Sequence, residues 1–207
     1  MDKEQKRILG HIPHLEEIDG WLLLVEAAEL FRCSDSIASP HPIVCEIGTW
    51  KGRSSYVLAS AMKGKGGVLY SVDPFNGEGD TASKDAYRAE LKRLGTTLVK
   101  NFEATMEQYG LRQYINVFPM LSEQARAVFT EPKIDLLFID GNHEYDWVKK
   151  DYELWTPLIP SGGIIALHDV KASHVDGPGR IMQEYIANSP QWKDARVVGE
   201  MGVAVKA

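Results

Sequence analysis

Short apolar runs alternate with amphipathic segments along most of the chain. Runs of strand length lie at residues 43–47, 68–72, 115–118, 134–139 and 164–167, and the segments between them carry apolar residues at helical spacing. Strands that alternate with helices predict parallel pairing through helical crossovers. Two last runs, 196–198 and 203–205, flank a glycine-bearing turn and predict a hairpin. The pattern therefore predicts an α/β fold: a Rossmann-like, doubly wound, mostly parallel sheet with helices on both faces and a C-terminal antiparallel hairpin.

Two segments lie outside this rhythm within what we expect to be a single domain over residues 1–207. Residues 1–40 form a predicted helical extension, in which 13–32 are apolar around more than one face. Such a helix either only covers the core or also contacts a second copy of the chain in a homodimer. Residues 75–97 form an insertion with a polar helix over 84–94, which we interpret as a lid over a ligand site, with a decorative loop as the alternative.

Composition excludes several classes of protein. The 207 residues carry a net charge of −6, whereas a nucleic-acid binder needs a basic surface. No apolar run reaches the length of about 18 residues that a membrane span requires. The only cysteines are Cys33 and Cys45, and Cys45 lies inside a predicted buried strand. We therefore expect two reduced thiols in a cytoplasmic protein that binds a small molecule, with no nucleic-acid or membrane partner.

The first predicted strand runs into a glycine-bearing turn and then a helix, the unit that cradles ligands in doubly wound proteins. Glycines allow the backbone to approach a ligand, and the helix N-terminus offers free N–H groups. An acid replaces the first glycine of a dinucleotide fingerprint, which disfavours a pyrophosphate and suits a cationic or hydroxyl-rich ligand. The candidate binding residues of this turn are Glu46, Gly48, Thr49, Gly52 and Ser54.

Acidic and histidine side chains follow the other predicted strands. Asp73 ends the second strand, where a carboxylate can bind ribose hydroxyls, although an aspartate before proline also forms turns. The fourth strand ends in Asp140 with His143 nearby, and the fifth in His168-Asp169. Strand ends of one parallel sheet share one crevice. Carboxylates with imidazole suit a divalent cation such as magnesium, whereas either histidine alone is more often structural.

These motifs together resemble class I S-adenosylmethionine-dependent methyltransferases over about residues 40–207. The pattern E-x-G-x-x-x-G at 46–52 resembles their first motif. The stretches F-I-D-G-N-H-E-Y at 138–145 and P-L-I-P-S-G-G-I-I-A-L-H-D at 157–169 are similar to a small bacterial subfamily. That subfamily is related to metal-dependent catechol-type and macrolide-sugar O-methyltransferases, and to cephalosporin-hydroxylase-like proteins.

The resemblance implies a role for each motif residue. Glu46, Gly48 and Gly52 match the motif that holds the methionine part of the cofactor, Asp73 the ribose-binding acid, and Ser122 a turn against the adenine. Asp140, His168 and Asp169 match metal-ligand positions, although His168 replaces an acid there. Asp140 also lies in the cofactor crevice. His143 takes the place of a lysine general base, and an imidazole can perform that role near neutral pH.

The sequence thus predicts an enzyme: an S-adenosylmethionine-dependent methyltransferase that methylates a small-molecule hydroxyl with the help of a divalent metal. An in-line methyl transfer needs mostly orientation of the acceptor and removal of its proton. Two alternatives stay open. One is a cephalosporin-hydroxylase-like oxidoreductase, and the other is a non-catalytic nucleotide-ligand-binding module on the same fold.

Overall fold

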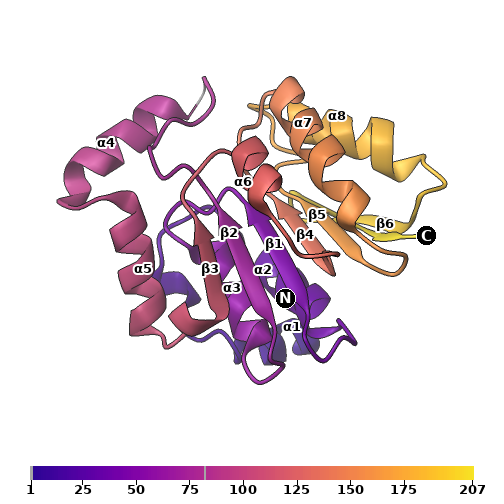
Figure 1. Cartoon of the computed structure of the whole chain (residues 1–207), viewed down its shortest axis with the longest axis horizontal. Coiled ribbons are helices and arrows are strands. Elements are labelled where there is room, and N and C mark those ends of the chain that lie inside the picture. The colour runs from indigo at the N-terminus through magenta and orange to yellow at the C-terminus, as the bar shows by residue number, and fades with distance from the viewer. Residues whose placement is uncertain (1, 82) are drawn as a thin grey trace.

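A seven-stranded sheet runs through the centre of the computed structural model, which describes residues 2–81 and 83–207 (Figure 1). The strand order is β3-β2-β1-β4-β5-β7-β6. β1 to β5 pair in parallel, whereas β7 is antiparallel to both β5 and β6. The predicted fold class is confirmed. The strands are β1 (Ile43–Ile47), β2 (Val68–Val72), β3 (Ile115–Phe118), β4 (Leu136–Ile139), β5 (Ile164–Leu167), β6 (Trp192–Val198) and β7 (Met201–Lys206).

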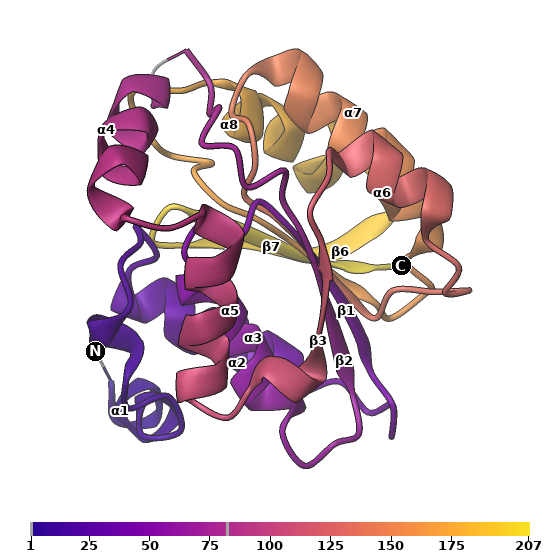
Figure 2. The same cartoon turned by 60° about the vertical axis from the view of Figure 1, so that its left-hand side comes forward.

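Helices cover both faces of the sheet and divide the core in two (Figure 2). All residues of β4 and β5 are buried, because each strand is covered on both sides. One face carries α1 (Lys3–Leu9), η1 (Leu15–Glu17), α2 (Leu24–Asp35), α3 (Arg53–Met62) and α5 (Leu98–Gln108). The other carries α6 (Ser122–Val128), α7 (Tyr145–Trp155), α8 (Gly177–Ile181) and its continuation η4 (Met182–Ala187). Short turns η2 (Arg112–Tyr114) and η3 (Thr156–Leu158) precede β3 and β5.

The predicted continuous helix over residues 13–32 is wrong. The chain forms η1, passes through an extended segment, and starts α2 only at Leu24. The reason is Arg53, whose guanidinium donates hydrogen bonds to the carbonyls of Leu15, Ile18 and Leu22 at 2.7–3.0 Å. The Leu15 carbonyl shares this guanidinium with the Ile18 amide of η1, and the carbonyls of Ile18 and Leu22 face the same side chain from α3. A homodimer contact through this segment stays a prediction.

The insertion contains α4 (Lys84–Leu94), as the sequence predicts. None of its residues is buried, and it projects from the body of the molecule (Figure 1). Lys51, from the turn after β1, forms ion pairs with Glu90 on α4 and with Asp19 of the N-terminal segment. One buried cation thus connects the insertion and the extension to the first turn of the sheet. The lid function of the insertion stays a prediction.

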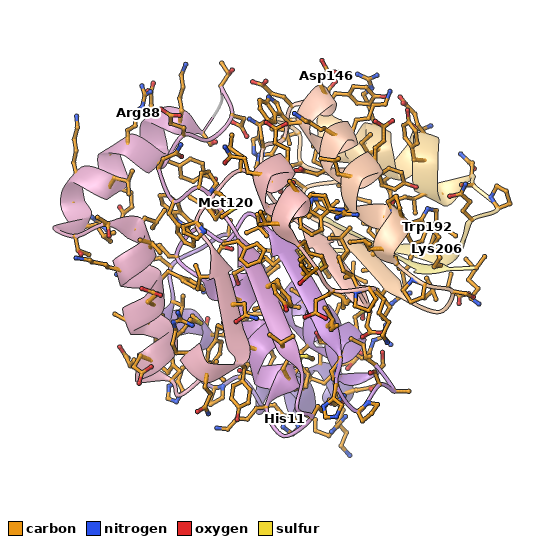
Figure 3. All side chains as sticks on the ribbon, in the orientation of Figure 1. His11, Arg88, Met120, Asp146, Trp192 and Lys206 are labelled. Atoms are coloured by element: carbon orange, nitrogen blue, oxygen red, sulfur yellow. The ribbon has the colours of Figure 1, made fainter. Side chains whose placement is uncertain are left out.

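The hairpin edge of the sheet closes the core at the C-terminus. Trp192 is buried there, donates a hydrogen bond to the Tyr152 hydroxyl at 2.9 Å, and lies under the ammonium group of Lys206 (Figure 3). Among the helices formed by residues 2–81 and 83–207, none has both the length and the apolar character needed to cross a bilayer.

Candidate active site

A cavity of about 770 Å³ lies at the carboxyl ends of the parallel strands, a volume typical of a small-molecule site. Its wall includes most residues that the sequence singles out. Six of the eight predicted cofactor-binding residues line it, together with the candidate metal and catalytic residues; these are Gly48, Thr49, Ser54, Asp73, Ser122, Asp140, His143, His168 and Asp169. Glu46 and Gly52 are absent from the wall: Glu46 is buried in β1 below the turn that follows this strand, and Gly52 ends that turn as the N-cap of α3.

The turn after β1 requires glycine for steric reasons. Gly48 has φ +87°, and a β-carbon there would lie 2.0 Å from the carbonyl oxygen of Asp140. Gly48 therefore brings the first turn directly against the end of β4. Gly52 has φ +92°, and a β-carbon there would contact Phe102 and Met106 on α5. Gly52 thus serves helix packing, while Gly48 shapes the cavity.

Glu46 is fully buried below the turn. One carboxylate oxygen accepts hydrogen bonds from the hydroxyls of Ser55, Thr49 and Ser71, and the other has no hydrogen-bond partner among the described residues. Burial raises the pKa of Glu46 to about 7, although serine hydroxyls oppose the shift. Because Glu46 does not reach the cavity wall, its direct contact with the cofactor stays a prediction.

Asp73 organises the same turn from the end of β2. Its carboxylate accepts hydrogen bonds from the backbone N–H groups of Thr49, Trp50 and Phe75 at 2.6–2.9 Å. These bonds hold Trp50 at φ +48°, a conformation that a non-glycine residue rarely adopts. Asp73 still lines the cavity, so ribose binding stays a prediction beside its observed role in the turn.

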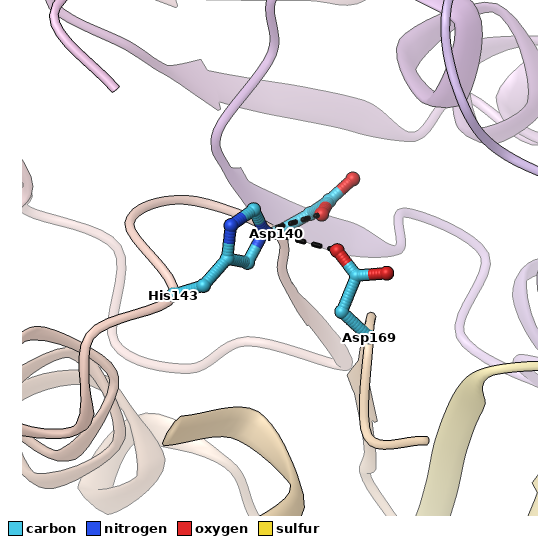
Figure 4. A group of neighbouring side chains, drawn as sticks. All are labelled: Asp140, His143 and Asp169. Carbon is cyan, nitrogen blue, oxygen red and sulfur yellow. Dashed lines mark ion pairs between the residues drawn. The ribbon is translucent and has the colours of Figure 1, made fainter. Parts of the chain in front are cut away.

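Asp140, His143 and Asp169 converge at the ends of β4 and β5 (Figure 4). His143 Nε2 lies 3.0 Å from Asp169 Oδ2 and 3.8 Å from Asp140 Oδ1. One ligand atom from each residue lies within 4.8 Å of the others. Asp169 has φ +58°, a strained conformation that turns its carboxylate toward the group. The two predicted acids are therefore brought together, and the histidine that joins them in this group is His143.

His168 lies near the same two acids. Its Nδ1 lies 3.2 Å from Asp140 Oδ1 and 3.3 Å from Asp169 Oδ2. Its Nε2 lies 3.1 Å from Glu26 on α2, and both side chains are buried. Glu26 also accepts hydrogen bonds from the backbone N–H groups of Leu23 and Glu200 at 2.7 Å. The prediction that His168 ligates a metal stays a prediction, and Glu26 is the partner that orients it.

His143 has a third carboxylate neighbour, Asp80, which belongs to the insertion. Its Nδ1 lies 2.5 Å from Asp80 Oδ2, and both side chains are largely buried. Thr81 donates a hydrogen bond to Glu144 at 2.8 Å beside this contact. Each imidazole of the site thus has one outer carboxylate, Asp80 or Glu26, and faces the Asp140–Asp169 pair with its other nitrogen.

The electrostatics of the group are strongly coupled. Burial by itself would lower the pKa of His143, but Asp140 and Asp169 raise it to about 10. Burial would raise the pKa of Asp169, but the two imidazoles hold it well below the usual range. Without another cation, protonated imidazoles therefore balance the carboxylates. A divalent ion bound at the same atoms would replace this positive charge.

The arrangement fits a divalent cation. His143 Nε2 is buried and has no hydrogen bond of good geometry among the described residues. If Nδ1–H donates to Asp80, the lone pair of Nε2 points at the two acids, which is the tautomer of a metal ligand. Two carboxylates with imidazole nitrogen suit magnesium, manganese or iron. The residues that would hold it are Asp140, His143 and Asp169, with His168 Nδ1 beside them.

Aromatic side chains form one flank of the cavity. Trp50 and Tyr87 have ring centroids 4.4 Å apart, and Trp21 lies 6.0 Å and 5.5 Å from them. They come from the first turn, α4 and the N-terminal segment, and Trp21 remains 62% exposed. Aromatic rings from three separate segments therefore line the same cavity as Asp140, His143 and Asp169. Their convergence has no local signal in the sequence.

Glu26 and Asp80, the outer carboxylates of the two histidines, differ in how far the sequence indicates a buried role for them. Glu26 stands in the stretch 21–31, where the only other charged residue is Glu29, and an acid buried among apolar residues needs a partner. Asp80 lies in an irregular loop with no such sign. Neither could be assigned to a histidine from the sequence, because the partners are far apart along the chain.

Comparison with known proteins identifies the central part of the chain. Residues 45–170 match the family profile of a methyltransferase domain. An uncharacterised protein, R132 of Acanthamoeba polyphaga mimivirus, is 26% identical over 126 residues, which cover 60% of this chain and 49% of that protein. The chain therefore spans about half the length of this curated relative.

Solved structures share the fold over the whole chain. Cofactor-bound Rv0187 from MTB has a TM-score of 0.67 at 15% identity, covering 100% of this chain and 90% of that one. The O-methyltransferase TomG from Streptomyces achromogenes, solved in complex with S-adenosylmethionine, has a TM-score of 0.65 at 14% identity, covering 100% and 91%. At these identities the likeness shows a common fold.

Proposed function

The chain belongs to the methyltransferase-domain family, and from this premise we propose that it transfers a methyl group from S-adenosylmethionine to a hydroxyl of a small molecule, with a divalent cation at Asp140 and Asp169. The observation that carries the proposal is the convergence of Asp140, His143 and Asp169 on the cavity that the first turn also lines. The turn after β1 would by itself only bind a cofactor. Asp140, His143 and Asp169 add side chains that could orient and deprotonate an acceptor hydroxyl.

The cofactor supplies a methyl group on a sulfonium, which is already electrophilic. The first turn contributes a surface of backbone around Gly48 and Thr49, and Asp73 fixes its conformation. The buried acid Glu46 lies below this surface. In its ionised form, which a neighbouring sulfonium would stabilise, its charge would favour the cationic cofactor over the neutral product. The S-adenosylmethionine seen in TomG supports this choice of cofactor.

A cation held by Asp140, Asp169 and one imidazole would lower the pKa of an acceptor hydroxyl. His143 has two candidate roles that use the same atom, Nε2: proton acceptor, as the sequence predicts, or third ligand. We favour the ligand role, because Nε2 lies within ligand spacing of both acids and Asp80 engages Nδ1. His143 would then orient the cation, and Asp80 would fix the direction of the ring.

The test has a binding arm and a transfer arm. Calorimetry should show binding of S-adenosylhomocysteine, and competition by NAD would instead favour the oxidoreductase alternative. A methyl-transfer screen over phenols and sugars should show activity that chelation removes and a divalent ion restores. Methyl transfer that survives exhaustive chelation, with Asp169→Ala binding as much metal as wild type, would contradict the role of the cation.

A further inference from the structure

Lys51 is a buried cation next to the aromatic flank of the cavity. Its side chain is only 7% exposed, and its ammonium group pairs with Asp19 at 2.9 Å and with Glu90 on α4. Burial would lower the pKa of Lys51, but the two carboxylates raise it, so the side chain stays charged. Lys51 lies outside the wall of the 770 Å³ cavity and lines a separate polar cavity of about 430 Å³. It therefore acts on the candidate active site through its ion-pair partners.

Both carboxylate partners of this lysine belong to segments that form the cavity wall. Asp19 lies two positions before Trp21, and Glu90 lies one helical turn after Tyr87 on the same side of α4. On the cavity side, the ring of Trp50 is 4.4 Å from that of Tyr87 and 6.0 Å from that of Trp21. The ring contacts and the ion pairs thus connect the same three segments: the N-terminal segment, the first turn and the insertion.

The other contacts of α4 with the body of the molecule are limited. None of its residues is buried, and Leu91 and Leu94 pack against the core while only partly buried. The contact of Asp80 with His143 holds the insertion before this helix begins. Elements with little buried surface open at low free-energy cost, whereas separating a carboxylate from a buried cation is costly. The ion pair of Glu90 is therefore a strong restraint on a weakly packed helix.

The identity of the ligand in this inference rests on the proposed function. We propose that Lys51 is a positioning residue, whose ion pairs hold the N-terminal segment and the insertion closed over the bound cofactor. The cofactor leaves the cavity when Glu90 separates from Lys51 and α4 moves away with Tyr87. The rate of ligand release is then set by this ion pair, although neither of its residues lines the cavity.

Reversal of the charges tests the ion pair through ligand release. The dissociation rate of radiolabelled S-adenosylhomocysteine is measured with an unlabelled chase. We expect Glu90→Lys to release the ligand about 10-fold faster or more, because it places two cations together at the contact. The double variant Lys51→Glu/Glu90→Lys restores opposite charges and should return to within about 3-fold of the wild-type rate. Asp85→Lys makes the same charge change at an exposed position of α4 and should release the ligand like wild type.

Amide hydrogen exchange of residues 84–94 gives a second measurement that needs no ligand. Exchange reports how often a helix opens. We expect the amides of α4 to exchange about 10-fold faster in Glu90→Lys than in wild type, and at the wild-type rate in the double variant. A lysine that only fills space would not be rescued by the reversed pair.

The outcomes separate this inference from the proposed function. Equal release and exchange rates in Glu90→Lys and Asp85→Lys, or no recovery in a folded double variant, overturn the role of Lys51 while the methyltransferase assignment stands. Absence of S-adenosylhomocysteine binding to wild type overturns the proposed function, and unchanged hydrogen exchange in Glu90→Lys overturns the closure by Lys51 separately. If the double variant does not fold, Glu90→Gln is compared with Asp85→Asn: faster exchange in Glu90→Gln alone supports the inference, and equal exchange overturns it.

Discussion

Glu26 Oε2 and His168 Nε2 lie 3.1 Å apart, although 142 positions separate the two residues along the chain. Glu26 belongs to α2, outside residues 45–170 that match the family profile, whereas His168 follows β5 inside them. Burial opposes the ionised form, but hydrogen bonds from His168, Glu200 and Leu23 keep the pKa of Glu26 below its usual range. The N-terminal segment therefore supplies a charged partner to the candidate active site.

We expect Glu26→Gln to weaken cation binding. A glutamine keeps the shape of the side chain but removes the charge that orients His168, and loss of such a supporting carboxylate typically lowers metal affinity by about 10- to 100-fold. Calorimetry with manganese measures the effect. Asp35→Asn, on the exposed end of the same helix, is the control and should bind like wild type. Equal affinity of Glu26→Gln and wild type would remove Glu26 from the site.

Asp80→Ala tests the connection between the insertion and the site. Without Asp80, the Nδ1 atom of His143 loses its buried carboxylate, and the ring is no longer fixed with Nε2 toward Asp140 and Asp169. We expect manganese affinity to fall about 10-fold or more. Asp85→Ala, at an exposed position of α4, is the matched control. A loss of the same size in both variants would show that the insertion acts only through its overall charge.

His143→Ala distinguishes the two roles of this residue. A cation ligand predicts clearly weakened manganese binding, because one of three converging donors is lost. A general base predicts nearly unchanged cation binding, a fall in turnover on the order of 10²-fold, and loss of the acidic limb of the pH–rate profile. Turnover and cation binding that both match wild type would exclude both roles.

Glu46→Gln should change how stability depends on pH. The pKa of Glu46 is raised by burial from 4.5 to about 7 in the folded state, so the folded protein retains a proton that the unfolded chain loses between these values. The contribution of Glu46 to stability therefore falls as pH rises through this window. The free energy of unfolding of the variant, relative to wild type, should rise by on the order of 3 kcal/mol between pH 4.5 and pH 7.5. Urea unfolding at both pH values measures it, and a constant difference would contradict the shift.

Gly48→Ala should disrupt the first turn. A β-carbon would lie 2.0 Å from the Asp140 carbonyl oxygen, and the backbone would be strained at φ +87°. We expect a loss of roughly 3 kcal/mol or more in the free energy of unfolding, from the clash together with the strain. Gly64→Ala is an informative control, because Gly64 has φ +88° with nothing within 4 Å of a β-carbon. It should lose only about 1 kcal/mol. Similar losses would mean that contact with β4 is unimportant.

Local patterns in the sequence were sufficient for the parallel sheet and most of its helices. β1, β2, β3, β5 and α4 have the predicted bounds, because short apolar runs and turn residues act within a few positions of each other. Local information failed for residues 13–32, where Arg53 from another helix takes the carbonyls of the segment. A contact between residues 38 positions apart leaves no periodic trace in the segment that it changes.

The sequence by itself determined which residues meet at the ends of the strands, since a parallel sheet with these strand lengths can only gather Asp73, Asp140 and Asp169 at one edge. It did not determine what each side chain contacts there. The tertiary structure decided that Asp73 binds backbone amides, that Glu46 lies below the cavity wall, and that each histidine has an outer carboxylate. Such pairings depend on distances of a few ångströms between segments far apart in the chain, and these are fixed only when the helices pack on the sheet.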